Sequence, residues 1–130
     1  MIHILIVDDE ADTHLLYKLK LKKIFHNVAE LNITSFLNAA DCLSYLHRND
    51  IPPVDLLLSD INMPQMDGFE FLAEVNILNV PFPIYMISAY ESPDFRKRAD
   101  DMGALRFLSK PVDFRSLGEL MKQDVVALNK

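Results

Sequence analysis

The sequence is poor in the features that mark secreted and membrane proteins. It has a single cysteine, Cys42, so no disulfide can form within the chain, and this fits a reducing compartment. It has no run of 18 or more apolar residues, which a membrane-spanning helix would need. The first residues, Met-Ile-His-Ile-Leu-Ile-Val, lack the basic start and the small-residue cleavage site of a signal peptide. We therefore expect a cytoplasmic protein, or one that faces the cytoplasm, with no membrane partner.

The chain also lacks the charge of a nucleic-acid-binding protein. Its 13 basic and 19 acidic residues give a net charge of −6, whereas phosphate binding needs clustered lysines and arginines. Four lysines that do cluster lie among apolar neighbours in a predicted helix: Lys18, Lys20, Lys22 and Lys23. We interpret them as a solvated helix face or, alternatively, as a patch that docks a partner. Nucleic acid is not an expected partner.

What remains is the composition of an ordinary soluble globular domain. Half of the residues are hydrophobic and a quarter are charged. The length of 130 residues is typical of one domain with one hydrophobic core. The chain has no internal repeat, low-complexity tract or flexible linker. Residues 1–130 are therefore predicted to form a single domain.

Short apolar runs alternate with stretches of helical periodicity along this domain. The runs have the length of strands buried on both faces of a sheet, and they cover residues 2–7, 30–35, 54–59, 84–88 and 105–108. Each is followed by apolar residues spaced three or four positions apart, as in amphipathic helices. These are Tyr17, Leu21 and Ile24; Ala39, Leu43 and Leu46; Phe69, Leu72 and Ala73; Phe95, Ala99 and Met102; and Leu117, Met121, Val125 and Leu128. Gly103 is predicted to end the fourth helix as its C′ residue. The alternation predicts an α/β fold of right-handed βαβ units, with a parallel sheet covered by five helices on both faces.

Polar residues follow several of the predicted strands. In open parallel sheets the functional crevice lies beyond the carboxyl ends of the strands. If the first and third strands are neighbours, Asp8, Asp9 and Asp60 converge there, and three such carboxylates repel one another unless a cation compensates. Carboxylate oxygens select Mg²⁺, Ca²⁺ or Mn²⁺ rather than zinc. Each aspartate alone is equally compatible with capping the following helix or facing its positive end.

Two further residues at strand ends suggest phosphoryl-transfer chemistry. Lys110 follows the fifth strand and Ser88 ends the fourth. Phosphoryl transfer requires charge neutralisation and an in-line approach, which a metal, a lysine and a hydroxyl can supply. Asp60 would then be the nucleophile, since a carboxylate can form an acyl phosphate.

Four segments of the sequence resemble, in order, the signatures of response-regulator receiver domains. They are Ile-Leu-Ile-Val-Asp-Asp-Glu at 4–10, Leu-Leu-Leu-Ser-Asp-Ile-Asn-Met-Pro-Gln-Met-Asp-Gly at 56–68, Ile-Ser-Ala at 87–89 and Phe-Leu-Ser-Lys-Pro at 107–111. The resemblance runs from the first strand to the last helix. It implies a flavodoxin-like, doubly wound sheet of five parallel strands in the order 2-1-3-4-5.

The resemblance also implies a phosphorylation site with Mg²⁺ as its cofactor. Asp60 corresponds to the phosphoacceptor, which also contacts the metal. Asp9 corresponds to the acid that binds Mg²⁺ directly, and Asp8 to its partner, which often acts through water. The backbone carbonyl of Asn62 corresponds to the third protein ligand.

A switch is implied by the remaining matches. Lys110 corresponds to the lysine that contacts the phosphoryl group, and its bond to Pro111 is expected to be cis. Ser88 corresponds to the switch hydroxyl and Phe107 to the switch aromatic. Because Phe107 has no hydroxyl, burial alone is expected to set its rotamer balance. Tyr90 either tunes access to the phosphate or simply lines the rim of the site.

The resemblance implies a signalling module rather than an enzyme, one that catalyses only its own phosphorylation and slow dephosphorylation. Its donor would be a phosphohistidine on a sensor histidine kinase or a histidine phosphotransfer protein, and its downstream target is unknown. Three alternatives remain. A haloacid-dehalogenase-like Mg²⁺-dependent phosphatase would have its nucleophile after the first strand in an Asp-x-Asp pattern. A flavodoxin-like carrier would have a Ser-, Thr- and Gly-rich loop there instead of Asp-Asp-Glu. A pseudo-receiver would act only as an interaction module.

Overall fold

The computed structural model of the protein describes residues 1–90 and 92–126. Its five parallel strands are β1 (Ile2–Val7), β2 (Leu31–Phe36), β3 (Leu56–Asp60), β4 (Ile84–Ser88) and β5 (Arg106–Ser109). Their order in the sheet is β2-β1-β3-β4-β5, which confirms the expected topology. The bounds of β1 and β4 are those predicted, and those of the other strands differ by one or two residues. One consequence is that Asp60 is the last residue of β3 rather than the first residue after it.

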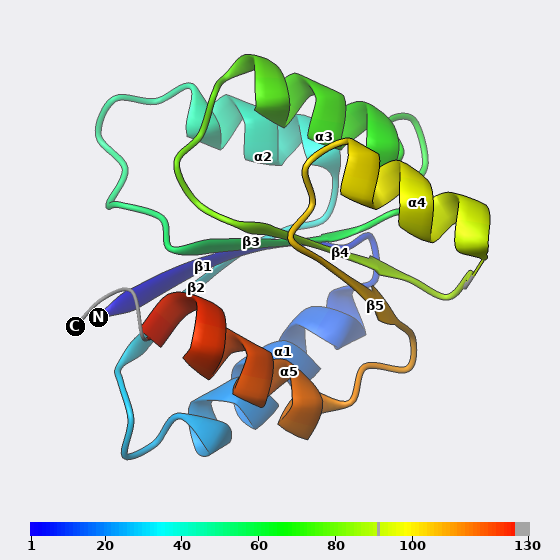
Figure 1. Ribbon diagram of the computed structural model, residues 1–130. Coiled ribbons are helices and arrows are strands. Elements are labelled where there is room, and N and C mark those ends of the chain that lie inside the picture. Colours follow the sequence, from blue (N-terminus) through cyan, green and yellow to red (C-terminus); the bar gives the residue numbers. More distant parts are fainter. Residues whose placement is uncertain (91, 127–130) are drawn as a thin grey trace.

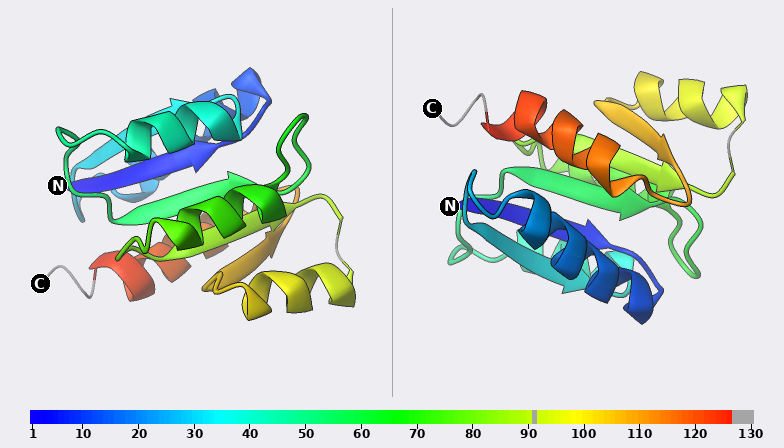
Figure 2. Two further views of the ribbon diagram at one scale, coloured as in Figure 1. Left: turned by 90° about the horizontal axis from the view of Figure 1, so that it is seen from above. Right: turned by 90° about the horizontal axis from the view of Figure 1, so that it is seen from below.

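Helices cover both faces of the sheet (Figures 1 and 2). They are α1 (Ala11–Ile24), α2 (Ala39–Leu46), α3 (Gly68–Ile77), α4 (Pro93–Asp101) and α5 (Phe114–Met121), the last of which continues as the π-helical turn η1 (Lys122–Val126). In Figure 1, α2, α3 and α4 lie above the sheet, and α1 and α5 lie below it. Among the described residues, no helix combines the length and the apolar character that crossing a bilayer requires.

Alternate residues of the central strands point to opposite faces and so build two cores. On β1, Leu5 and Val7 pack with α2 and α3, whereas Ile4 and Ile6 pack with Tyr17 of α1 and its neighbours. All of these side chains are at most 1% exposed. Burying one side chain of this size stabilises the fold by about 1.5–3 kcal/mol. β1 pairs in parallel with β2 on one side and with β3 on the other, so it lies inside the sheet.

Most of the predicted helix faces are confirmed, with one exception in α3. Phe69 and Leu72 are buried as predicted, but Ala73 is exposed and Val75 is buried instead. The buried face of α3 therefore continues from Leu72 toward Val75, three positions further on, and leaves Ala73 on the solvent side. Gly103 has φ = +93° directly after the last turn of α4, as a C′ glycine should.

The terminal helix presents its predicted apolar face to the core, since Leu117, Met121 and Val125 are all buried. Leu128, which the same pattern includes, lies outside the described residues. Four of the helices begin at a side-chain cap close to the edge of the sheet where the strands end, and at α2 the side chain of Asn38 accepts from the N–H of Asp41. Asp67 forms a capping box with Glu70 at the start of α3, Ser92 caps α4 and Asp113 caps α5.

Candidate functional site

The carboxyl ends of the strands bring the predicted residues to one edge of the sheet. β1 pairs directly with β3, with Val7 opposite Ser59, which is the adjacency on which the convergence of the aspartates depends. Asp60 lies opposite Ile87, and Ser88 lies opposite Ser109. The strand arrowheads in Figure 2 point toward this same edge. Residues that are far apart in the sequence therefore meet in a single place.

Three carboxylates meet at the centre of this edge. One oxygen each from Asp8, Asp9 and Asp60 lie within 4.8 Å of one another. Asp8 and Asp60 are 2% and 4% exposed, whereas Asp9 is exposed to solvent. An all-oxygen set open on one side suits a hard dication, which keeps water and accepts further oxygen ligands there. The cluster therefore fits Mg²⁺ binding.

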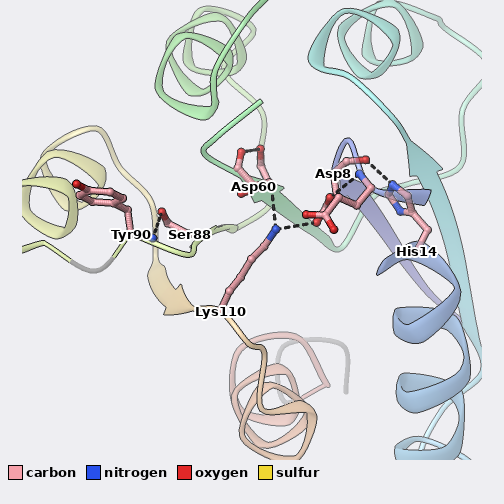
Figure 3. A network of polar contacts seen from close by, with 8 residues as sticks. Asp8, His14, Asp60, Ser88, Tyr90 and Lys110 are labelled. Carbon is pink, nitrogen blue, oxygen red and sulfur yellow. Dashed lines mark hydrogen bonds and ion pairs between the residues drawn. The ribbon is translucent and has the colours of Figure 1, made fainter. Parts of the chain in front are cut away.

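Lys110 is the cation that faces this cluster (Figure 3). Its Nζ lies 2.9 Å from Oδ2 of Asp60 and 3.3 Å from Oδ2 of Asp8. Burial raises the pKa of Asp60, and the negative charge of Asp8 adds to this, while Lys110 and a backbone hydrogen bond from Asn62 oppose it without cancelling it. Burial lowers the pKa of Lys110, but the two carboxylates outweigh burial and the pKa is raised. When all four groups are ionised, the ammonium balances only one of the three carboxylates.

The backbone beneath Asp60 is packed against the start of α3. The N–H of Gly68 donates to the carbonyl oxygen of Ile61 at 2.7 Å, and the N–H of Ile61 donates to Ile87 at 3.0 Å. A Cβ atom on residue 68 would lie 2.5 Å from the backbone oxygen of Asp60 and 2.6 Å from Cα of Ile61. Only glycine permits so close an approach, so Gly68 supports the position of Asp60. The sequence placed Gly68 at the end of a receiver-domain signature but did not reveal its contact with Asp60.

Ser88 and Lys110 are joined through the backbone beside the carboxylates. Ser88 is fully buried, and its Oγ accepts a hydrogen bond from the N–H of Tyr90 at 2.9 Å. The carbonyl oxygen of Ser88 accepts from the N–H of Lys110 at 2.9 Å. The peptide bond between Lys110 and Pro111 is cis, as predicted. Tyr90 is 65% exposed, and its ring centroid lies 5.8 Å from that of Phe95. The ring points away from Asp60 (Figure 3), so it lines the rim of the site.

Phe107 makes a contact that the expectation of burial alone did not include, and its rotamer balance stays a prediction. Phe107 is half-buried, and the guanidinium of Arg96 lies over its ring, 4.9 Å from the centroid. Arg96 also donates to the backbone oxygen of Phe107 at 3.3 Å. A cation over an aromatic face is an attractive contact that contributes to the conformation seen here. The sequence did not reveal this contact, because Arg96 lies on α4 and Phe107 on β5.

Residues 4–122 match the model of one protein family, which is described as "Response regulator receiver domain". This match decides which family the chain belongs to. The chain belongs to this family. Receiver domains are signalling modules of two-component systems rather than classical enzymes, so the phosphatase and flavodoxin alternatives are set aside.

Relatives of this receiver domain differ in how much of their own length the chain covers. This chain is 36% identical over 126 residues to the "Uncharacterized 14.6 kDa protein in sodA1 3'region" of Leptolyngbya boryana, and the match covers 95% of this chain and 90% of that protein. It is 34% identical over 116 residues to the transcriptional regulatory protein ZraR of Klebsiella oxytoca, covering 89% of this chain and 24% of ZraR. The chain thus spans about a quarter of the length of that regulator. Because relatives include transcriptional regulators, the expectation of no nucleic-acid partner stays a prediction.

Solved structures agree on the fold. A response regulator receiver domain protein from Clostridium thermocellum superimposes with a TM-score of 0.84 at 19% identity, covering 99% of this chain and 98% of that one. The chemotaxis protein CheY4 of Vibrio cholerae superimposes with a TM-score of 0.81 at 24% identity, covering 96% and 99% of the two chains. At these identities the likeness concerns the fold alone.

Proposed function

We propose that residues 1–130 act as a phosphorelay receiver domain whose phosphoacceptor is Asp60. The donor is a phosphohistidine on a sensor histidine kinase or a histidine phosphotransfer protein in the cytoplasm. The observation that carries the proposal is the ammonium of Lys110 between Asp60 and Asp8, inside a cluster of three carboxylates. A pseudo-receiver that acts only through its surface would not need this costly arrangement of buried charge.

The donor set of the cluster suggests which residues would hold Mg²⁺. Asp9, Asp60 and the backbone carbonyl of Asn62 would bind it directly, and Asp8 would act through water. When bound, Mg²⁺ neutralises the carboxylates and the oxygens of the incoming phosphoryl group.

The protein's own groups have defined tasks in the transfer. A carboxylate oxygen of Asp60 attacks phosphorus, a P–O bond forms, and the P–N bond of the phosphohistidine breaks in line with it. The electron pair of the broken bond stays on the imidazole nitrogen of the donor, which is then free to take up a proton. Lys110 balances charge on the transferred group, and the hydroxyl of Ser88 donates to one of its oxygens.

The donor would dock beside Lys110. A hollow of about 430 Å³ lies between the start of α1 and the segment that joins β5 to α5. Its lining includes Lys110, together with apolar side chains such as Leu16, Pro111 and Phe114. Leu16 is 47% exposed, so its apolar surface is available to a partner. This combination suits a partner helix that carries the phosphohistidine to the edge of the sheet.

Phosphorylation would switch the surface formed by α4, β5 and α5. The hydroxyl of Ser88, which now accepts from Tyr90, would turn to the phosphoryl oxygens and leave space behind it. Phe107 would turn into this space, and the contact of its ring with Arg96 would be lost. The ligand state thereby biases two conformations of one surface.

The test is incubation of the protein with acetyl phosphate, with and without Mg²⁺, followed by mass measurement and peptide mapping. We expect the mass to increase by one phosphoryl group only when Mg²⁺ is present, and the modified peptide to contain Asp60. Modification of another residue, or modification that is independent of Mg²⁺, would contradict the proposal.

Arg96 offers a test of the switch. We expect Arg96→Ala to raise the apparent affinity for beryllofluoride, measured with Mg²⁺ present, by about two- to fivefold, because a partly exposed cation–π contact of about 0.5–1 kcal/mol holds Phe107 outward. The matched control is Arg98→Ala, since Arg98 also lies on α4 but covers Phe69, with 4.2 Å to the ring centroid. Equal affinities in the two variants would show that Arg96 does not hold the switch.

A further inference from the structure

We propose that His14 is a positioning residue for the metal site, acting by fixing the peptide group between Asp8 and Asp9. The inference rests on the proposed function, because it concerns how the same Mg²⁺ site is built. The imidazole of His14 comes from the first turn of α1 and reaches back to the end of β1 (Figure 3). His14 is only 6% exposed, so it is part of the support beneath the carboxylates rather than a group facing the phosphate donor.

The contact of His14 has a defined direction. Its Nε2 lies 2.7 Å from the backbone oxygen of Asp8. A carbonyl oxygen can only accept a hydrogen bond, so Nε2 carries the hydrogen and donates it. The other groups of Asp8 are also held: its N–H donates to Phe36 at 3.0 Å, Oδ1 accepts from the N–H of Glu10 at 2.9 Å, and Oδ2 contacts Lys110. His14 therefore fixes the carbonyl at the point where the chain leaves the sheet.

Fixing this carbonyl determines where Asp9 lies. The peptide group is planar, so the direction of the Asp8 carbonyl sets the direction of the N–H and Cα of Asp9. Across residues 1–90 and 92–126, no hydrogen bond or ion pair anchors the exposed carboxylate of Asp9. That carboxylate nevertheless lies within 4.8 Å of those of Asp8 and Asp60. The backbone that His14 holds is thus the main constraint on the carboxylate proposed to bind Mg²⁺ directly.

The surroundings of Nδ1, the other ring nitrogen of His14, support a role for Nε2. Within the described part of the chain, Nδ1 of His14 is buried and has no hydrogen-bond partner. An apolar side chain of similar size would avoid the cost of burying that nitrogen. What leucine could not supply is the hydrogen bond from Nε2 to Asp8. The imidazole is therefore explained by this bond rather than by packing alone.

His3 provides a matched control for the effect of burying a histidine. It is 1% exposed, its Nδ1 is likewise buried without a partner among the described residues, and its Nε2 lies 2.9 Å from Oγ1 of Thr34. It lies near the start of β1, at the opposite end of the strand from Asp8. Replacing it disturbs a buried imidazole without touching the acidic cluster.

The experiment is titration calorimetry with Mg²⁺ on the wild type, His14→Leu, His14→Gln and His3→Leu, with folding checked by circular dichroism. We expect His14→Leu to bind Mg²⁺ about tenfold more weakly, as when the outer partners of metal ligands are removed. His14→Gln should restore most of the affinity, because its amide nitrogen is as many bonds from Cα as Nε2 is. His3→Leu should bind as the wild type does. In phosphorylation assays, His14→Leu should need more Mg²⁺ yet reach the same maximal rate.

Several outcomes would overturn the inference. His14→Leu could bind Mg²⁺ as tightly as the wild type, His14→Gln could lose as much affinity as His14→Leu, or His3→Leu could weaken binding equally. If His14→Leu does not fold, His14→Asn replaces it, since its shorter amide cannot reach the carbonyl, and it must show the same deficit. A wild type that binds no Mg²⁺ would instead remove the proposed function itself. If the wild type binds Mg²⁺ and His14→Leu binds it with the same affinity, only the role of His14 is ruled out.

Discussion

Replacing Asp60 with asparagine is expected to abolish phosphorylation by acetyl phosphate and to stabilise the metal-free protein. The loss of phosphorylation follows from chemistry, because a neutral amide is not the carboxylate nucleophile that forms an acyl phosphate. The lysine contact need not be lost, since the amide oxygen of asparagine can still accept from Lys110, whose Nζ lies 2.9 Å from Asp60 Oδ2 in the wild type. The variant therefore separates nucleophilicity from local architecture.

The gain in stability follows from the raised pKa of Asp60. Asp60 is 4% exposed; burial, with Asp8 adding its charge, raises the pKa of the carboxyl although Lys110 opposes the shift. A carboxyl with a raised pKa binds its proton more tightly in the folded protein than in the unfolded chain. Its contribution therefore lowers stability as pH rises from the ordinary aspartate pKa of about 4 through the raised value. Removing the charge should thus stabilise the fold by about 1 kcal/mol at pH 7, and the gain should vanish near pH 4.

Thermal unfolding of the metal-free protein at pH 4 and pH 7, with mass measurement after acetyl phosphate treatment, checks both parts. Asp55→Asn is the control, because Asp55 precedes β3 at the opposite edge of the sheet and accepts a hydrogen bond from the N–H of His3. That variant should still be phosphorylated. A phosphorylated Asp60→Asn protein would move the acceptor to another residue, and a lower stability at pH 7 would show that Lys110 outweighs burial.

Replacing Lys110 with alanine is expected to slow phosphorylation by about a hundredfold and to uncouple modification from the change in surface. The fold should be retained, but destabilised by about 2 kcal/mol at pH 7, below the usual range for a fully buried pair. The reason is that Asp8 and Asp60 then face each other without the ammonium that lies 3.3 and 2.9 Å from them. The side chain of Lys110 is itself 19% exposed, so water screens part of the effect.

Acid should reverse this destabilisation. Without Lys110 the pKa of Asp60 rises further, so the folded variant gains stability relative to the wild type as pH falls and the carboxylates take up protons. Unfolding at pH 4 and pH 7 measures the effect, and phosphorylation rates measure the kinetic part. Lys97→Ala is the matched control, since Lys97 lies on α4 in an exposed pair with Asp101. A destabilisation that is the same at both pH values would point to lost packing rather than to unbalanced charge.

Much of this protein can be predicted from sequence because its three central strands, β1, β3 and β4, are short, mostly apolar and buried on both faces. The runs at 2–7 and 84–88 match β1 and β4 residue for residue. Prediction was weaker where polar residues lie at the ends of a strand. The run at 54–59 begins two residues before β3, because Asp55 bonds outside the strand to His3 and Pro52 and Pro53 precede it.

The sequence by itself determined the alternation of strands and helices, and so placed acids, a hydroxyl and a lysine at strand ends. These are local patterns, which depend on the burial of each segment. The resemblance to receiver domains also predicted the strand order, and with it the pairing of β1 with β3. Only the tertiary structure decided three further contacts: Gly68 against the backbone of Asp60, Arg96 over Phe107, and His14 beneath Asp8. The physical reason is that such contacts join segments through the packing of helices on a sheet, and apolar periodicity shows which face of a helix is buried but not which polar side chain lies opposite it.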